Sequence, residues 1–233
     1  MIAIIVPAHN EEALLGACLA SLRVAAGHAA LEREPVVVVV ALDRCTDGSR
    51  AIAQRAGVEW VDLDVGNVGV ARAAAAERAL TLGARWVAST DADTRVPADW
   101  LAAQLRAGTD AFCGVVTIDD WLDFDAATVA AFDGPAPPGD GHRHIHGANF
   151  GISAQAYRRC GGFAPMPCSE DVAIVHALEA IGGSIHWAGQ PRVVTSARRD
   201  PRACGGFGDY LKALEDVVHG GEPMVGHVLP ALT

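Results

Sequence analysis

The sequence lacks the features that mark membrane-spanning and secreted proteins. Its longest apolar run covers residues 36–42, far short of the roughly 20 residues that a helix needs to cross a bilayer. The amino terminus carries no basic flank and becomes polar at His9, so it is not typical of a signal peptide. From these absences we expect a cytoplasmic protein that does not span a membrane.

Basic stripes, aromatic platforms and paired-cysteine motifs are also missing. The formal net charge is −10 and only 6% of the residues are aromatic, which argues against nucleic acid as a partner. The cysteines show no C-x-x-C spacing, so we expect reduced thiols with packing roles. They stand at Cys18, Cys45, Cys113, Cys160, Cys168 and Cys204. The chain does have 233 residues, 51% of them hydrophobic, which is enough for a sizeable core.

Before Pro97 the chain alternates four times between an apolar strand and a helical segment. We expect strands at residues 1–6, 36–42, 58–63 and 85–90, and helices at residues 13–24, from 49 to about 56, and 70–82. This alternation is the signature of an α/β fold with a parallel, doubly wound sheet. Such sheets bind ligands at the carboxyl ends of their strands.

The pattern changes after Pro97. There we expect a helix beginning at Pro97, a strand at 112–118, a helix at 121–132, a strand at 147–152, a turn at 161–163, a helix from 168 to about 181, short strands at 185–187 and 193–194, and a last helix at 206–218. The segment 133–146 is dense in Pro and Gly, which predicts a mobile loop. Its histidines, His142, His144 and His146, have no carboxylate or cysteine at ligand spacing, so we favour substrate contact or a solvated loop over a metal site.

Two carboxylates follow the fourth strand. Asp91 and Asp93 stand one residue apart at its carboxyl end. Hard anionic oxygens in such a place suit Mg²⁺ or Mn²⁺, which take one or two protein carboxylates and complete their shell with phosphate oxygens and water. The pair therefore predicts a metal–diphosphate site. The alternative is that either residue caps the following helix.

Two helix starts carry polar groups with more than one interpretation. Gly66 and Gly69 do not fit the G-x-G-x-x-G spacing, but the helix that they open could hold phosphate beside Arg72; the alternative is a cap with a solvated arginine. Glu170 and Asp171, in the first turn of their helix, could stabilise it by interacting with the helix dipole. Neighbours on a helix lie about 100° apart around its axis, so only one of these two can point at a given substrate atom.

Taken in order, these motifs resemble the family-2 glycosyltransferases with the GT-A fold, over nearly the whole chain. The resemblance rests on Ile5 to Glu12, Asp43 to Ser49, Gly66 to Arg72, Thr90 to Thr94, and Gly161 to Phe163 followed by Glu170 and Asp171. It implies a GT-A-type Rossmann-like sheet, mostly parallel, with helices on both faces.

The resemblance also implies roles for single residues. Asp171 would be the general base, Asp93 the direct ligand of Mn²⁺ or Mg²⁺, and Arg198 would neutralise the leaving diphosphate. The nucleotide-sugar would be bound by Pro7, Ala8, Asn10, Glu11, Asp43, Arg72 and Asp91, with Asp43 at the base and Asp91 serving ribose and metal. Two departures stand out: the turn after the second strand reads Leu-Asp-Arg-Cys at 42–45 where the family has Asp-Asp-Gly-Ser, and only His186 and His176 are available as a third metal ligand.

We therefore expect a metal-dependent, inverting glycosyltransferase that moves a sugar from a nucleotide-diphosphate donor to a hydroxyl acceptor. Residues 1–97 would form the donor-binding half, and residues 98–233 the acceptor-binding half, of one domain. The chain carries no membrane helices of the kind found in processive synthases, which favours a single-transfer enzyme. Two alternatives remain: a nucleotidyltransferase, which would want a Gly- and Lys-rich first loop that 7–12 does not provide, and a catalytically silent sugar-nucleotide-binding scaffold.

Overall fold

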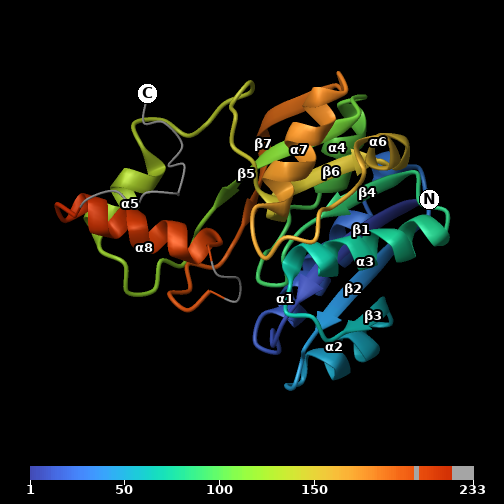
Figure 1. Ribbon diagram of the computed structural model, residues 1–233, viewed down its shortest axis with the longest axis horizontal. Coiled ribbons are helices and arrows are strands. Elements are labelled where there is room, and N and C mark those ends of the chain that lie inside the picture. The colour runs from blue at the N-terminus through green and yellow to red at the C-terminus, as the bar shows by residue number, and fades with distance from the viewer. Residues whose placement is uncertain (202–204, 222–233) are drawn as a thin grey trace.

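A sheet of seven strands organises the computed structural model, which describes residues 1–201 and 205–221 (Figure 1). The strands are β1 (Ile2–Ala8), β2 (Val36–Asp43), β3 (Glu59–Leu63), β4 (Trp86–Ser89), β5 (Ala111–Thr117), β6 (Phe150–Ser153) and β7 (Ile185–Val194). Their order across the sheet is β3-β2-β1-β4-β6-β5-β7. Strand β6 runs antiparallel to β4 and β5, and the other pairings are parallel. The predicted mostly parallel α/β sheet is confirmed.

Eight α-helices accompany these strands in the described part of the chain. They are α1 (Leu15–Ala26), α2 (Ser49–Ala56), α3 (Val68–Thr81), α4 (Trp100–Arg106), α5 (Ala126–Asp133), α6 (Ala154–Cys160), α7 (Glu170–Ala180) and α8 (Phe207–Val218). One apolar cluster joins the sheet to α1, α2 and α4, and a second joins its other face to α3, α6 and α7. Helices therefore cover both faces, as expected.

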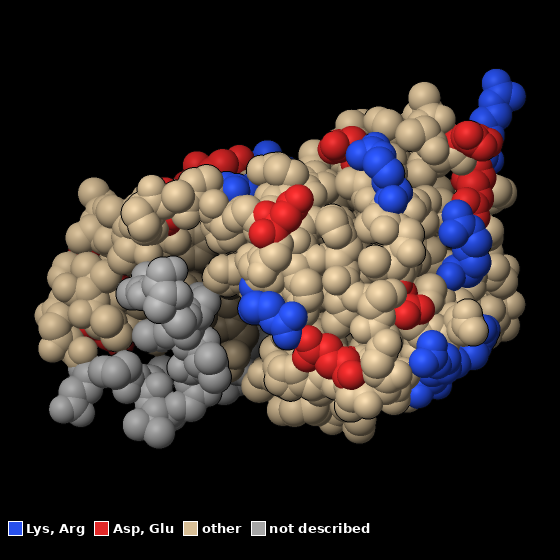
Figure 2. Space-filling view, turned by 90° about the horizontal axis from the view of Figure 1, so that it is seen from above, with Lys and Arg blue, Asp and Glu red and all other residues tan. Residues whose placement is uncertain are grey.

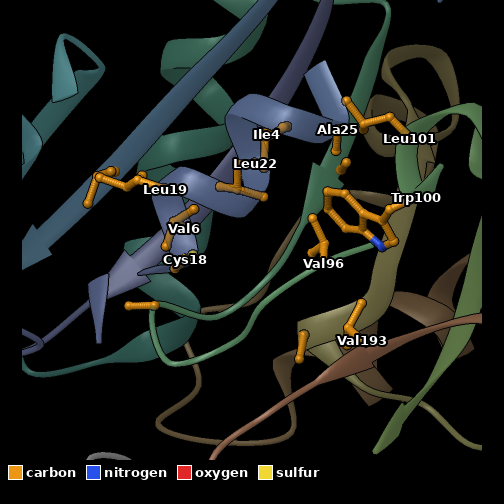
Figure 3. Close-up of a cluster of buried hydrophobic side chains, with 14 of the residues drawn as sticks. Ile4, Val6, Cys18, Leu19, Leu22, Ala25, Val96, Trp100, Leu101 and Val193 are labelled. Carbon is orange, nitrogen blue, oxygen red and sulfur yellow. The ribbon is translucent and has the colours of Figure 1, made fainter. Parts of the chain in front are cut away.

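Strand β1 lies at the centre of both apolar clusters. Ile4 and Val6 point into the cluster beneath α1 and α4, whereas Ala3 and Ile5 point to the opposite face. Figure 3 shows the first cluster, in which Trp100 of α4 lies near Ala25 of α1 and near Val96. A parallel strand covered on both faces needs a continuous apolar run, which explains why the β1 sequence shows no polar alternation.

Several predicted boundaries were wrong for local reasons. The helix expected from residue 121 begins at Ala126, because the Asp125 carboxylate caps it by accepting from Thr128 N at 2.8 Å. The helix expected from Pro97 begins at Trp100. Helix α6 was not predicted, although Ser153 caps its start and Gly161 ends it in the left-handed conformation.

The carboxyl-terminal strands also differ from the prediction. The two short strands expected at 185–187 and 193–194 are one strand, β7, whose pairing with β5 shifts register between Gly114 and Val116. Residues 147–149 form a 3₁₀ turn rather than the start of β6. At the amino-terminal end, Pro7 and Ala8 belong to β1 rather than to the loop after it.

Helices α5 and α8 pack against each other at one side of the sheet, at the left of Figure 1. Aromatic side chains fill the contact between them, with Phe132 edge-on to both Phe207 and Tyr210. The loop between α5 and β6 returns along β7, where Gly141 N donates to Trp187 O at 2.8 Å. This segment is a loop as expected, and its mobility stays a prediction.

Within residues 1–201 and 205–221, no helix is long and apolar enough to cross a membrane. The predicted cytoplasmic location stays a prediction. The five cysteines in this part of the chain are all free, as expected; Cys204 lies outside the described residues.

Candidate functional site

The polar loops of the chain meet at one edge of the sheet. Strands β1, β2 and β4 are parallel, so the loops after Ala8, Asp43 and Ser89 all leave from that edge. Strand β6 is antiparallel and begins there, since Phe150 pairs with Ser89. Strand β7 ends at the same edge and leads into Arg198. This topology brings residues from distant parts of the sequence into one site.

Arg72 of α3 is at the centre of this site. Its side chain is 4% exposed, and its Nε donates to Glu170 Oε1 at 2.7 Å. Its Nη1 donates to Ser89 Oγ at 2.5 Å and to the Gly147 carbonyl at 3.3 Å. Its Nη2 donates to Asp91 Oδ1 at 2.5 Å. The guanidinium therefore ties α3 to β4, to α7 and to the turn before β6.

A second arginine, Arg198, bridges two of the predicted site residues. Its Nη2 lies 2.7 Å from Asp93 Oδ2 and 2.8 Å from the Glu11 carboxylate. Glu11 comes from the loop after β1, Asp93 from the loop after β4, and Arg198 itself from the segment after β7. Hydrogen bonds to Glu11 and Asp93 outweigh burial and raise the pKa of Arg198, which is therefore a permanent cation here.

The site carries more negative than positive charge. Burial, and then the neighbouring charge of Asp91, raise the pKa of Asp93 although Arg198 acts in the opposite direction. Burial and the charges of Asp93, Asp91 and Glu11 likewise raise the pKa of the Cys18 thiol. Elsewhere, on the face shown in Figure 2, Lys and Arg side chains of the described residues are scattered among carboxylates rather than gathered into a patch. The excess of carboxylates suits a cation at the site. On the face in Figure 2, the described residues offer no basic surface.

The Glu170–Asp171 pair divides its roles as the helix geometry requires. Glu170 is buried and bonded to Arg72, while Asp171 is half-buried and accepts from Gly147 N at 2.6 Å and from Val172 N at 2.8 Å. Burial, and then the charge of Glu170, raise the pKa of Asp171 from 3.8 to about 6, despite the opposing effects of Arg72 and the two backbone N–H groups. A carboxylate with such a pKa can accept a proton near neutral pH.

The turn after β2 is held to the loop after β1 by side-chain caps. Asn10 Oδ1 accepts from Thr46 N at 2.8 Å, and Ser49 Oγ accepts from Glu11 N at 2.8 Å. Asp43 is buried, and its carboxylate accepts from the backbone N–H groups of 65–67 at 2.9 to 3.0 Å. Burial alone would raise the pKa of Asp43, but these bonds hold it below its usual value. Asp43 thus shapes the wall of the site, and its contact with a base stays a prediction.

The start of α3 is capped by the protein itself. Asn67 Oδ1 accepts from Val70 N at 3.0 Å, and Met166 O accepts from Gly69 N at 3.0 Å. A Cβ on Gly69 would lie 2.1 Å from the Ala164 carbonyl oxygen, so the 164–166 loop covers this helix end. Two N–H groups of the first turn are thus already bonded within the protein, and phosphate binding at this helix end stays a prediction. The alternative of a solvated Arg72 is wrong.

Asp91 and Asp93 fit a divalent cation that shares its shell with a ligand. Each uses one carboxylate oxygen for an arginine, Asp91 Oδ1 for Arg72 and Asp93 Oδ2 for Arg198. Two hard oxygens are the usual protein contribution to Mg²⁺ or Mn²⁺ beside a diphosphate. In the described part of the chain, no group of three His, Cys, Asp or Glu is placed to hold a metal.

The two candidate third ligands are not at this site. His186 is the second residue of β7, at the opposite edge of the sheet, where it packs against Phe112. His176 is exposed on α7. His144 and His146 stack on each other in the loop before β6, and the part that this histidine run plays stays a prediction.

Sequence reasoning missed Ser89 and Gly147, which join Arg72 to the rest of the site. The signal for Ser89 was its place just before the acidic pair, on a strand expected to end there. Gly147 gave no local signal, because its importance comes from its contacts with Arg72 and Asp171, which are distant in sequence. A Cβ there would lie 2.5 Å from Arg72 Nη2, and its N–H is bonded to Asp171.

Solved structures with this architecture include several enzymes. TarS of S. aureus, in complex with UDP-GlcNAc, superposes with a TM-score of 0.65 at 15% identity over 93% of this chain. The mannosyltransferase PcManGT of Pyrobaculum calidifontis, in complex with GDP-Man and Mn²⁺, gives 0.61 at 19% identity, over 94% of this chain and 70% of its own. Glucosyl-3-phosphoglycerate synthase of Mycobacterium tuberculosis gives 0.57 at 16% identity, over 94% of this chain and 77% of its own. The predicted GT-A fold is confirmed.

The chain spans 66% of that TarS structure, about two thirds of its length. No curated protein matches the sequence. A family model, described as glycosyl transferase family 2, matches residues 3–135. Because that match covers more than half of the sequence, the chain belongs to glycosyl transferase family 2.

Proposed function

We propose that this chain transfers a sugar from a nucleoside-diphosphate donor to a hydroxyl acceptor, with a divalent cation and with inversion at the anomeric carbon. One observation carries the proposal: Asp91, of the acidic pair, and Asp171 are joined on one sheet edge through the buried guanidinium of Arg72 and the Gly147 backbone that it contacts. A metal-type carboxylate pair and a base with a raised pKa are the two groups that such a transfer needs.

The donor is proposed to bind over residues 1–97. Pro7, Ala8, Asn10 and Glu11 would line the nucleoside pocket, and Asp43 would meet the base beside the turn at 65–67. The interlocked loops after β1 and β2 support this assignment because they are fixed by hydrogen bonds before any ligand arrives. The similar enzymes that were solved with UDP-GlcNAc and GDP-Man support the donor class and leave the base open.

Charge explains why a cation would be needed. A diphosphate cannot approach Asp91, Asp93 and Glu11 unless positive charge lies between them. Mg²⁺ or Mn²⁺ held by Asp91 and Asp93 would offset the charge that develops on the leaving diphosphate. In that state Arg198, which contacts Asp93, would exchange this carboxylate for the diphosphate.

The acceptor is proposed to bind over residues 98–233, on the side of Asp171. The acceptor oxygen would form a bond to the anomeric carbon while the bond from that carbon to the diphosphate oxygen breaks. The bonding electron pair leaves with the nucleoside diphosphate, and the hydroxyl proton passes to the Asp171 carboxylate. Attack on the face opposite the leaving group inverts the anomeric centre.

Binding of nucleoside diphosphates tests the donor site. UDP, GDP, ADP and dTDP are titrated by calorimetry and by thermal shift, with Mn²⁺ and with EDTA, because a ligand of the folded state raises its stability with concentration over Kd. We expect at least one to bind, and to bind much more weakly in EDTA. Asp93→Ala should cause a similar loss, whereas Glu77→Ala, an exposed carboxylate in the second half of α3, should not. Equal affinity with and without metal would contradict the metal site.

A further inference from the structure

Arg72 is enclosed by protein acceptors. Its side chain is 4% exposed, and its Nε, Nη1 and Nη2 atoms all donate within the protein. A guanidinium has five N–H donors, and the contacts described above occupy four of them. So little free donor capacity, in so buried a group, does not suit a clamp for phosphate. The resemblance to other glycosyltransferases places Arg72 near the nucleotide, but its contacts favour a different role.

Gly147 transmits the position of Arg72 to Asp171. Its carbonyl accepts from Arg72 Nη1 at 3.3 Å, and its N–H donates to Asp171 Oδ2 at 2.6 Å. A Cβ at this position would lie 2.5 Å from Nη2 and 2.8 Å from Cζ of Arg72. Glycine is therefore the residue that lets the guanidinium lie against this backbone, and the backbone in turn holds the carboxylate.

A second route runs through α7. Glu170 Oε1 accepts from Arg72 Nε at 2.7 Å, and both side chains are about 5% exposed or less. Glu170 is the first residue of α7 and Asp171 is the second, so the ion pair fixes the helix start that carries Asp171. On the donor side, Arg72 Nη2 holds Asp91 at 2.5 Å.

We propose that Arg72 is a positioning residue that fixes the Asp171 carboxylate relative to Asp91, and thereby aligns the acceptor base with the donor side of the site. This inference rests on the proposed function, since it takes Asp171 to be the base. Misplacement of a reacting group by about 1 Å can cost about 10² in rate. The effect of Arg72 should accordingly appear in kcat, and donor affinity should be largely independent of it.

The charged groups around Asp171 make its titration a direct readout. Glu170 faces it from the same helix, Arg72 from α3, and the Cys113 thiol from β5. The Gly147 amide is bonded to the Asp171 carboxylate, so its proton chemical shift should follow that carboxylate as pH changes. This measurement needs neither substrate nor turnover.

The test compares Arg72→Lys with Arg78→Lys. Lysine keeps the charge but cannot reproduce the planar fork of a guanidinium, and Arg78 lies on the same helix in a pair with Glu59 that is about 40% exposed. We expect Arg72→Lys to lower kcat for donor turnover about 10²-fold, to leave the Kd of UDP or GDP with Mn²⁺ nearly unchanged, and to reduce the titration of the Gly147 amide. Arg78→Lys should change none of these.

A double variant guards against misfolding. Arg72→Met with Glu170→Met removes both members of the fully buried pair, so no buried Glu170 charge is left unpaired; Asp91, which also loses its Arg72 partner, is 35% exposed. The same loss of kcat and of the Gly147 titration is expected. A Kd loss as large as the kcat loss would overturn the inference and make Arg72 a nucleotide ligand. Unchanged kcat together with an unchanged Gly147 titration would also overturn it. If the wild type turns over no donor, the proposed function fails, while the Gly147 titration still decides whether Arg72 positions Asp171.

Discussion

Replacing Asp171 by asparagine should stabilise the protein at neutral pH while it abolishes transfer. Asp171 has a pKa raised from 3.8 to about 6, first by burial and then by the charge of Glu170. The folded state therefore binds this proton more tightly than the unfolded chain does. The contribution of the group to stability is fully present below about pH 4 and is lost as pH rises through 6. Asparagine resembles the protonated carboxyl because it is uncharged and because its amide oxygen can still accept from Gly147 N.

The size of this effect follows from the pKa shift. About 2 pK units correspond to about 3 kcal/mol at 1.36 kcal/mol per unit, and the partial exposure of Asp171 lowers the expected value to about 2 kcal/mol. Asp171→Asn should thus raise the free energy of unfolding by about this amount at pH 8, and by nearly nothing at pH 4. The kcat/KM of the wild type should fall as pH drops through about 6, because the base must be ionised.

Urea denaturation at a series of pH values from 4 to 8 measures the difference between wild type and variant. Glu77→Gln, an exposed change from carboxylate to amide on α3, is the matched control and should show no such pH trend. A difference between Asp171→Asn and wild type that stays the same from pH 4 to 8 would refute the raised pKa. A less stable variant at pH 8 would show that Asp171 caps its helix instead, and the base would then have to be sought elsewhere, first at Glu170.

Two further predictions concern Arg198 and Gly147. Arg198→Ala frees the Asp93 carboxylate, so Mn²⁺ alone should bind about tenfold more tightly, as measured by electron paramagnetic resonance. UDP or GDP should instead bind about tenfold more weakly, as expected for the loss of one charge-assisted hydrogen bond. Affinities for Mn²⁺ and for the nucleotide that change in the same direction would contradict the exchange of partners. Gly147→Ala should lower both donor turnover and melting temperature, since its Cβ would lie 2.5 Å from Arg72. The control Gly16→Ala, whose Cβ enters open space in α1, should instead stabilise the folded protein by about 0.5 to 1 kcal/mol. Equal melting temperatures for the two variants would refute the close approach.

The first half of the fold was predictable because its signals are local. The apolar run at 36–42 needs only its own composition to read as a buried strand, and the structure has it as β2, Val36–Asp43. The second half was harder. Gln190 and Pro191 interrupt the apolar pattern of β7, so one strand reads as two. The antiparallel direction of β6 depends on where the chain returns to the sheet, which no local pattern records.

The candidate site divides in the same way. Asp91, Asp93 and Asp171 could be named as candidates because acidic residues at a strand end or a helix start are visible in the sequence, and the family resemblance favoured Asp171 over Glu170. The partners of Arg72 could not, since Gly147 is separated from it by 75 residues and Glu170 by 98. A single buried guanidinium with long-range partners has no sequence signature of its own. Its role emerges only when the sheet topology brings those segments together.

The central claim is tested most directly by the stereochemistry of donor turnover. UDP- and GDP-sugars are incubated with the protein, Mn²⁺ and a panel of hydroxyl acceptors, and the products are followed by ¹H NMR of the anomeric proton. We expect a product of inverted configuration, and a rate that falls about 10² to 10⁴-fold in Asp171→Asn while donor affinity is kept. Donor that binds without any turnover, or full turnover by Asp171→Asn, would contradict this account.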